Sequence, residues 1–287
     1  MPLVSIIIPF APYHKTIVAQ AIAAARAQSL SCAVIPVEDG NGAGAGWARN
    51  RGVALSDTPF VCFLDADDTL RPDALERMIE VYQQGKYVYC DDYAGASLHQ
   101  TSDMGYYDGT WWHTITTLIP RAAFDAVGGF NETLPALEDM DLFIRLQGRG
   151  VCGVRCPRPL VRYTAGGQRS IAFKKHPDYK TLRGDIFGKW SHKAMCNCGA
   201  PINGLVPDGK SENDVLVQTL YTPMQKIGPA TGRLYPRARG STDMQIWVDP
   251  RDIAARPDWW QIIRKVDPAS MPRVDDVVAM AREAMRS

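Results

Sequence analysis

Apolar runs alternate with helical patterns through the first half of the chain. Residues 3–9 and 32–37 are short, continuous apolar runs, which are typical of strands covered on both faces. Between them, residues 14–28 place Ile17 and Ala21 on one face at helical spacing. Strands that alternate with helices in this way predict a parallel sheet, and ligands bind such sheets at the carboxyl ends of the strands.

The densest charge on the chain follows the next apolar run, residues 60–64. Asp65, Asp67 and Asp68 come directly after it. Carboxylates this close repel one another, and a divalent cation removes the repulsion. Mn²⁺ and Mg²⁺ bind through one or two carboxylates and complete their coordination with water and substrate phosphate. The alternative interpretation is a solvated acidic turn that caps a helix beginning near residues 71–73.

A second group of polar residues follows the strand at 32–37. Asp39 ends that strand, the glycine-rich loop 40–46 comes next, and the following helix carries Arg49. The loop lets backbone approach a ligand closely, Asp39 can accept a hydrogen bond from a base or ribose, and Arg49 supplies positive charge. We expect Asp39 and the acidic cluster to face one crevice, which has the parts that a nucleotide diphosphate needs.

Composition indicates an ordinary globular protein. The 287 residues have a formal charge of +1, so charge does not imply general nucleic-acid binding. We expect no secretory signal, and no apolar run approaches the ~18 residues of a membrane span. Of seven cysteines, Cys32, Cys62 and Cys90 lie in apolar runs, which favours buried thiols and a cytoplasmic location.

Four short motifs in the same order resemble family 2 glycosyltransferases. They are the opening Val4–Pro9 run, Val37–Gly40, Ala48–Gly52 and Phe63–Asp68, and the resemblance extends over about residues 2–170. It implies a GT-A fold, a Rossmann-like, mostly parallel α/β sheet flanked by helices. It also implies transfer of a sugar from a nucleotide-sugar donor, with Mn²⁺ or Mg²⁺ as cofactor and Asp67 as a metal ligand. The donor-side residues would be Pro9, Asp39, Arg49, Asp65 and Ala66.

The second half supplies the acceptor side. Glu138 and Asp139 lie in the first turn of a predicted helix, where the helix dipole alone favours carboxylates. The resemblance implies instead that Asp139 is the base that takes the acceptor proton. Its acceptor-side candidates are Trp111, Trp112, Gly129, Phe130 and Glu138. The two tryptophans could stack on a sugar ring or belong to the core, and both interpretations stay open.

One departure from the family concerns the metal. Relatives often carry a metal-binding histidine just beyond a Tyr-Arg-x-His-like strand, and the matching residues 161–170 contain none. The ion could be held by Asp67, donor phosphates and water alone. His176 could also reach it from the following loop, although a lone histidine is more often an ordinary surface residue.

The composition changes near residue 195. Turn-rich segments surround predicted strands at 215–221 and 244–248. We therefore predict two domains, a GT-A domain over 1–195 and a small β-rich module with a closing helix over 196–287. One face of that helix should dock on the body. The module is faintly similar to C-terminal modules of some phage-encoded glycosyltransferases, which would place the protein in a host cytoplasm.

Four other cysteines could form a zinc site, namely Cys152, Cys156, Cys196 and Cys198. Their spacing is not the usual pair separated by two residues, so free thiols are favoured.

Together these patterns predict a metal-dependent, inverting glycosyltransferase that moves a sugar, from a UDP-sugar, to a hydroxyl acceptor. The acceptor could be a glycan, a protein or a modified nucleobase. The alternative is a non-catalytic nucleotide-sugar-binding or interaction protein on a GT-A scaffold. A degenerate scaffold should have lost its acidic residues, and this chain retains them.

Overall fold

The structure of the protein is a computed structural model that describes residues 2–101, 113–164, 181–182, 186, 213–219, 228–233, 235, 245–262 and 267–286. The strands of its main sheet are β1 (Val4–Phe10), β2 (Cys32–Glu38), β3 (Phe60–Phe63), β4 (Thr69–Leu70), β5 (Lys86–Ala94), β6 (Ser97–His99), β7 (Leu118–Pro120) and β8 (Cys152–Tyr163). The helices around it are α1 (Val18–Arg26), α2 (Ala45–Ala54), α3 (Ala74–Glu80), α4 (Arg121–Ala126), α5 (Glu138–Gly148) and α9 (Val274–Ala284). Among the helices that the structure describes, none is long and apolar enough to cross a membrane.

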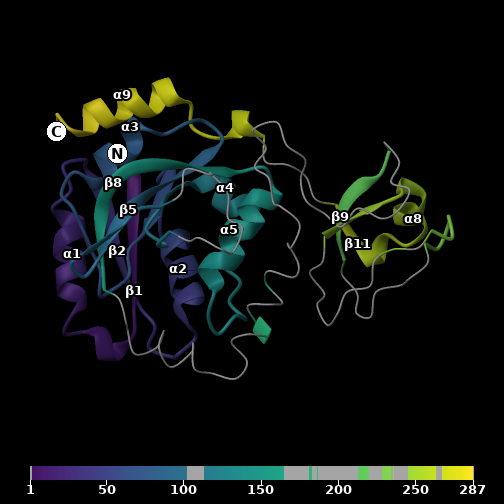
Figure 1. Cartoon of the computed structure of the whole chain (residues 1–287), viewed down its shortest axis with the longest axis horizontal. Coiled ribbons are helices and arrows are strands. Elements are labelled where there is room, and N and C mark those ends of the chain that lie inside the picture. The colour runs from purple at the N-terminus through teal and green to yellow at the C-terminus, as the bar shows by residue number, and fades with distance from the viewer. Residues whose placement is uncertain are drawn as a thin grey trace.

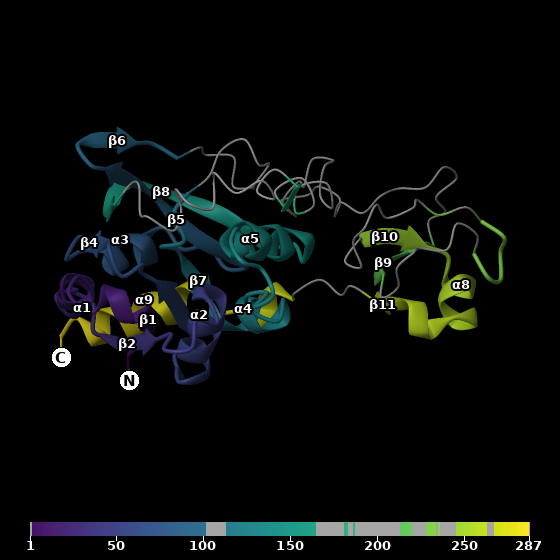
Figure 2. The same ribbon diagram turned by 90° about the horizontal axis from the view of Figure 1, so that it is seen from below.

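The main sheet contains eight of the described strands. Its order is β2-β1-β3-β7-β5-β8-β4, with β6 paired to β5 (Figure 1 and Figure 2). β1 pairs in parallel with β2 and β3, and β5 pairs in parallel with β8. The remaining pairings, which involve β7, β4 and β6, are antiparallel. The predicted α/β sheet with flanking helices is therefore present, and the sheet is mixed.

Alternating side chains of the strands feed two cores. Phe60 and Cys62 of β3 enter a core that includes residues of α1, α3 and α9, whereas Val61 and Phe63 enter a core with residues of α4 and α5. Because successive side chains of a strand point to opposite faces, a run that is apolar throughout must be covered on both sides. This explains why the sheet strands read as continuous apolar runs. Figure 1 shows α1 on one side of β1 and α2 on the other.

The first helix is shorter than the predicted range of 14–28. Residues Pro12–His14 form a separate 3₁₀ turn, η1, and α1 begins only at Val18. Pro12 suits the start of a short turn, because its φ is preset and it lacks a backbone N–H.

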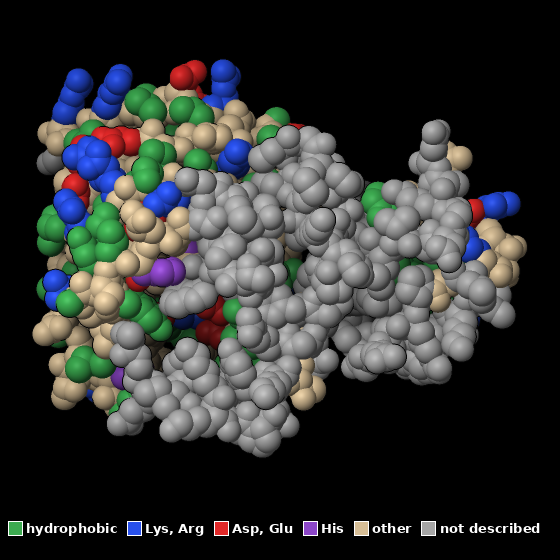
Figure 3. Space-filling view, in the orientation of Figure 1, with side chains coloured by type: hydrophobic (Ala, Val, Ile, Leu, Met, Phe, Trp, Pro, Cys, Tyr) green, Lys and Arg blue, Asp and Glu red, His purple; other side chains and the backbone are tan. Residues whose placement is uncertain are grey.

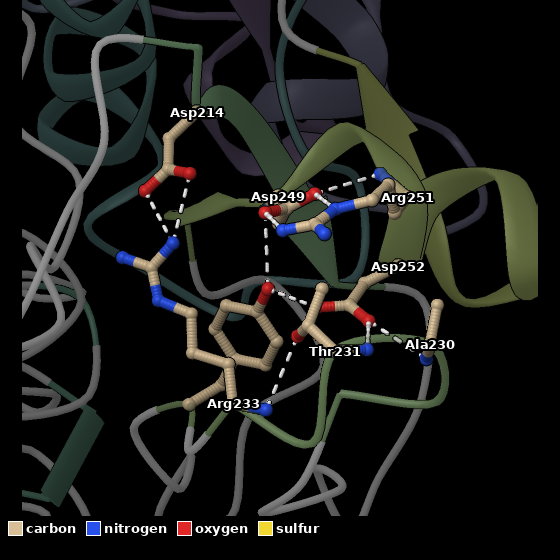
Figure 4. A network of polar contacts seen from close by, with 8 residues as sticks. Asp214, Ala230, Thr231, Arg233, Asp249, Arg251 and Asp252 are labelled. Atoms are coloured by element: carbon tan, nitrogen blue, oxygen red, sulfur yellow. Dashed lines mark hydrogen bonds and ion pairs between the residues drawn. The ribbon is translucent and has the colours of Figure 1, made fainter.

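The C-terminal module contains a small antiparallel sheet in the order β10-β9-β11, made of Gln245–Val248, Val215–Thr219 and Trp260–Ile262. Asp252, in helix α8 (Pro250–Ala255), organises the turn beside this sheet and is fully buried. It accepts hydrogen bonds from the backbone of Ala230 and Thr231, from the Thr231 hydroxyl and from Tyr235 (Figure 4). The β-rich character predicted for this region is therefore observed in the part that the structure describes.

The closing helix packs on the main body. Val277 and Ala281 of α9 are buried in the same core as α1 and α3, and the Tyr82 hydroxyl donates to the carbonyl of Pro272 at 2.9 Å. The predicted docking of this helix is correct. The proposed boundary at residue 195 lies outside the described residues and stays a prediction, but α9 completes the core of the first domain.

Candidate active site

The site lies at the carboxyl ends of β1, β2 and β3, where the predicted polar residues meet. β2 leads to Asp39, β3 leads to Asp65, and α2 begins after the glycine-rich loop. Parallel pairing of β1 with both neighbours brings these ends to one edge of the sheet. Figure 3 shows acidic side chains in a hollow on one face of the molecule.

Asp39 shapes the glycine-rich loop. Its two carboxylate oxygens accept hydrogen bonds from the backbone N–H groups of Ala43, at 2.8 Å, and Gly44, at 2.7 Å. Gly44 precedes α2 with a φ of 105°, a conformation that favours glycine. Asp39 is buried, as are Pro9 of β1 and Ala66. Each Asp39 oxygen therefore already has one partner within the loop, and donor contacts of Asp39, Pro9 and Ala66 stay predictions.

Arg49 connects the two acidic motifs. It projects from α2, and its side chain is only 5% exposed. One guanidinium nitrogen donates to Asp65 at 2.7 Å, and another donates to Glu138 at 2.7 Å. The guanidinium also lies 5.2 Å from the ring centroid of Phe130, a cation–π distance. Residues far apart in the sequence, after β3 and at the start of α5, are thus joined by a single side chain.

Asn50, the next residue of α2, holds the loop that contains Gly129 and Phe130. Its amide donates to the Phe130 carbonyl at 2.9 Å and to Glu132 at 2.7 Å, and its oxygen accepts from the Phe130 N–H at 2.8 Å. Gly129 has a φ of 70°, and a Cβ there would lie 2.6 Å from the Asn50 oxygen. Sequence analysis includes Asn50 in a motif without assigning it a role. No signal within its own segment identifies a partner 80 residues away.

The opposite side of the same loop is held by α5. Arg145 donates to the carbonyls of Val127 and Gly129, at 2.7 Å each, and pairs with Asp141 on its own helix. The Gly-Gly-Phe segment is therefore fixed between α2 and α5 by side-chain hydrogen bonds to its backbone. This leaves little freedom for the loop that the resemblance places on the acceptor side.

Asp139 sits in the first turn of α5, beside Glu138. The residue before them, Leu137, has a φ of 63°, the one left-handed non-glycine conformation among the described residues. Such strain is kept where the surrounding structure imposes it, often at functional sites. Burial raises the pKa of Asp139 to about 6, and the charge of Glu138 acts in the same direction. A carboxylate with that pKa is suited to accept a proton near neutral pH.

The acidic cluster after β3 divides into two kinds of residue. Asp67 is partly exposed; burial raises its pKa, and the charge of Asp65 raises it further. Asp68 is buried and accepts the N–H of Thr164 at 2.7 Å, which pins the end of β8 to the cluster. Asp68 is thus held by Thr164 and Asp65 by Arg49, whereas Asp67 is partly exposed at the crevice.

Tyr163, at the end of β8, is a site residue that sequence analysis does not select. Burial raises the pKa of Tyr163 to about 12, and the charges of Asp68, Asp65, Asp67 and Asp139 all add to this effect. The Tyr163 phenol is therefore close enough to both acidic motifs to be affected by their charges. The sequence signal that could have identified Tyr163 is its place in residues 161–170, which match the Tyr-Arg-x-His-like strand of the family.

A metal ion would need ligands beyond those that the described residues supply. Within the described ranges, no three His, Cys, Asp or Glu side chains are grouped closely enough to hold an ion by themselves. Burial raises the pKa of Asp67 most, and the charge of Asp65 adds to it; a divalent cation would relieve that repulsion between the two carboxylates. Asp67 therefore fits an ion that takes one or two carboxylates and completes its coordination with diphosphate and water.

Three predicted site residues cannot be located relative to the crevice. Trp111, Trp112 and His176 lie outside the described residues. Their neighbour His113 is buried in the second core, stacked on Tyr89 with a centroid distance of 4.7 Å.

The cysteine prediction needs a correction. Cys32, Cys62, Cys90 and Cys156 are free thiols, as favoured, but Cys152 is disulfide-bonded. A disulfide sulfur is not a thiolate ligand, so Cys152 does not support a zinc site. Cys196 and Cys198 lie outside the described residues.

The fold places the chain among the α/β proteins, whose ligands bind beyond the carboxyl ends of sheet strands. Residues 15–133 match the family described as glycosyl transferase family 2. The predicted resemblance is confirmed over that segment, and the mixed sheet with flanking helices is the predicted α/β fold class. The matched segment contains α2, the acidic cluster and the Gly-Gly-Phe loop, and it ends before Asp139.

Solved structures of TarS from S. aureus are similar at low sequence identity. One TarS crystal structure has a TM-score of 0.47 and 12% identity, covering 69% of this chain and 45% of that chain. TarS 1–349 in complex with UDP-GlcNAc has a TM-score of 0.49 and 12% identity, covering 66% of this chain and 71% of that one. This chain thus spans less than half of the first structure. No curated protein sequence matches it.

Proposed function

We propose that the protein transfers a sugar from a nucleotide-sugar donor, a UDP-sugar, to a hydroxyl acceptor with inversion at the anomeric carbon. The observation that carries the proposal is the pair of 2.7 Å contacts from Arg49 to Asp65 and Glu138. These contacts bring the acidic motif after β3 within one side chain of the carboxylates at the start of α5. Such a transfer needs at least one carboxylate on the side that binds the nucleotide sugar and one candidate base in the same crevice.

On the donor side, Asp67 would hold a divalent ion, Mn²⁺ or Mg²⁺, and Asp65 would lie nearer the ribose. The bound ion would supply Lewis-acid stabilisation of charge on the departing diphosphate. Asp39 and the glycine-rich loop would line the nucleotide pocket. His176 remains a second candidate ligand on sequence grounds alone. The choice of UDP rests on the resemblance found in the sequence.

On the acceptor side, Asp139 would act as general base. It takes the proton of the acceptor hydroxyl while that oxygen bonds to the anomeric carbon, and the bond from this carbon to the diphosphate oxygen breaks. The nucleoside diphosphate leaves with the bonding electrons. One displacement inverts the configuration, so an α-linked donor should give a β-glycoside. Glu138, Gly129 and Phe130 would border the acceptor, together with Trp111 and Trp112.

The test is a panel of nucleotide sugars with Mn²⁺, read by the release of free nucleotide and repeated with EDTA. Asp139→Asn should lower turnover by ~10²–10⁴-fold while UDP affinity stays nearly unchanged. Asp67→Ala should lose metal-dependent donor binding. Asp125→Asn is a matched control, because Asp125 is an exposed carboxylate whose ion-pair partner within the described part of the chain is Arg121 on α4.

Two outcomes would reject the proposal. Donor binding without turnover for any sugar would favour the alternative, a nucleotide-sugar-binding protein. An α-linked product, detected by the anomeric proton coupling in its NMR spectrum, would exclude single displacement.

We also propose a cytoplasmic location, although one feature counts against it. Disulfides are uncommon in a reducing cytoplasm, and Cys152 is disulfide-bonded. Thiol titration of the protein isolated from cells without oxidation would test this point, because seven free thiols per chain would match a reducing compartment.

A further inference from the structure

Arg49 occupies the position between the donor and acceptor halves of the site. We infer that Arg49 is a positioning residue, which holds Glu138 and hence Asp139 in register with Asp65, and that it does not bind donor phosphate. The inference rests on the proposed function, in which Asp139 is the base. It differs from the sequence-based expectation that Arg49 contributes positive charge to the donor pocket.

The charge around Arg49 argues against phosphate binding. Its side chain is 5% exposed, and two carboxylates share its one positive charge. The group of three therefore carries a net negative charge, which repels an incoming diphosphate. Its Nε atom is buried without a hydrogen-bond partner among the described residues, and the face of the guanidinium is covered by Phe130.

The neighbouring residues of α2 make Arg49 part of a rigid contact with the acceptor side. Asn50 binds the backbone of Phe130 on both its N–H and its carbonyl. At Gly46, a Cβ would lie 3.4 Å from Phe130 and 3.8 Å from Glu138, so the helix approaches these residues closely. Helix α2 therefore contacts the Gly-Gly-Phe loop and the start of α5 along one face, and Arg49 extends that contact to the acidic cluster.

The electrostatics at Asp139 provide a way to measure this role. The pKa of Asp139 is raised by burial and by the charge of Glu138, lowered by Arg49, and raised by Asp65. Tyr163 also faces Asp139, but its phenol stays neutral at physiological pH because its pKa is about 12. Removing Arg49 takes away the lowering effect and leaves the charge of Glu138 uncompensated. Both changes raise the pKa of Asp139.

The experiment compares the wild-type protein with Arg49→Met and Arg49→Met/Glu138→Gln. Carboxyl ¹³C NMR gives the titration midpoint of Asp139 without substrate, and calorimetry gives the UDP affinity. In Arg49→Met the midpoint should rise by about one pH unit or more, and UDP affinity should change by less than about threefold. In the double variant the midpoint should return most of the way. The acidic limb of the pH–rate profile should move with the NMR midpoint.

Arg155→Met is the matched control, because Arg155 is a partly buried arginine paired with a buried carboxylate, Asp91, on another part of the sheet. It should leave the Asp139 midpoint in place. If Arg49→Met does not fold, the double variant is compared with Glu138→Gln, and the midpoint should be higher in the double variant.

An unchanged Asp139 midpoint in Arg49→Met would overturn the inference. So would a loss of UDP affinity of about tenfold or more without a shift of the midpoint, which would assign Arg49 to the donor. Failure of the proposed function is a separate result: the wild-type protein would release no nucleotide, while the NMR midpoint could still move as expected.

Discussion

Replacing Asn50 tests whether side chains of α2 hold the Gly-Gly-Phe loop in place. Asn50→Ala removes three hydrogen bonds, of 2.7 to 2.9 Å, and leaves the N–H and carbonyl of the buried Phe130 without these partners. The bond to Glu132 is exposed and contributes little. The loss of the two partly buried bonds, which leaves the N–H and carbonyl of Phe130 unpaired, should cost about 3 kcal/mol. Alanine is the better helix former by about 0.6 kcal/mol, so the net loss of stability should be about 2 kcal/mol.

Urea unfolding measures this loss, and hydrogen exchange over residues 127–132 reports whether the loop itself opens. Asn50→Asp is informative, because aspartate keeps the acceptor for the Phe130 N–H but loses both donations. It should be destabilised, with faster exchange in the loop. Asn131→Ala is the control: among the described residues the Asn131 side chain accepts hydrogen bonds only from exposed Thr133, and its removal should cost below about 1 kcal/mol.

The reasoning would be refuted if Asn50→Ala cost no more than Asn131→Ala. It would also fail if the variant were destabilised globally while exchange in the loop stayed at the wild-type rate. In that case Asn50 would matter to the helix and not to the segment it contacts.

Three further predictions concern the body of the protein. Burial lowers the pKa of His113 from 6.5 to about 4, so its contribution to stability is present above pH 6.5 and is lost as the pH falls towards 4. Between pH 7 and 5 the loss should be about 2 kcal/mol in urea unfolding, and His113→Gln should flatten this dependence. Gly52→Ala places a Cβ 2.3 Å from Ile7 and should cost about 1–3 kcal/mol or more. A chain that ends at residue 195 lacks α9 and the burial of Val277, so its melting temperature should fall and it should aggregate; an unchanged melting temperature would show that α9 is dispensable.

The sheet, and the placement of Asp39 and the acidic cluster at the ends of its strands, were predictable because their signals are local. Apolar runs that are covered on both faces read as strands, and the motifs after the strands follow directly from the chain. The antiparallel strand β7 was not predictable in this way, because three residues, Leu118–Pro120, carry too short a pattern to fix a direction. The same holds for the disulfide at Cys152, since spacing alone does not identify a partner.

The roles of Asp39, Arg49 and Asn50 were harder to predict because each depends on pairing across space. The sequence shows that Arg49 is positively charged, but only the fold shows that it is already paired with two carboxylates. The role of Asn50 also depends on a distant residue, because its side-chain amide hydrogen-bonds the backbone N–H and carbonyl of Phe130. The Ala-Arg-Asn-x-Gly motif is then understood physically. Arg49 joins the two acidic motifs, Asn50 holds the Gly-Gly-Phe loop, and Gly52 allows α2 to approach Ile7 of β1. One helix thereby sets the distance between the proposed donor and acceptor sides.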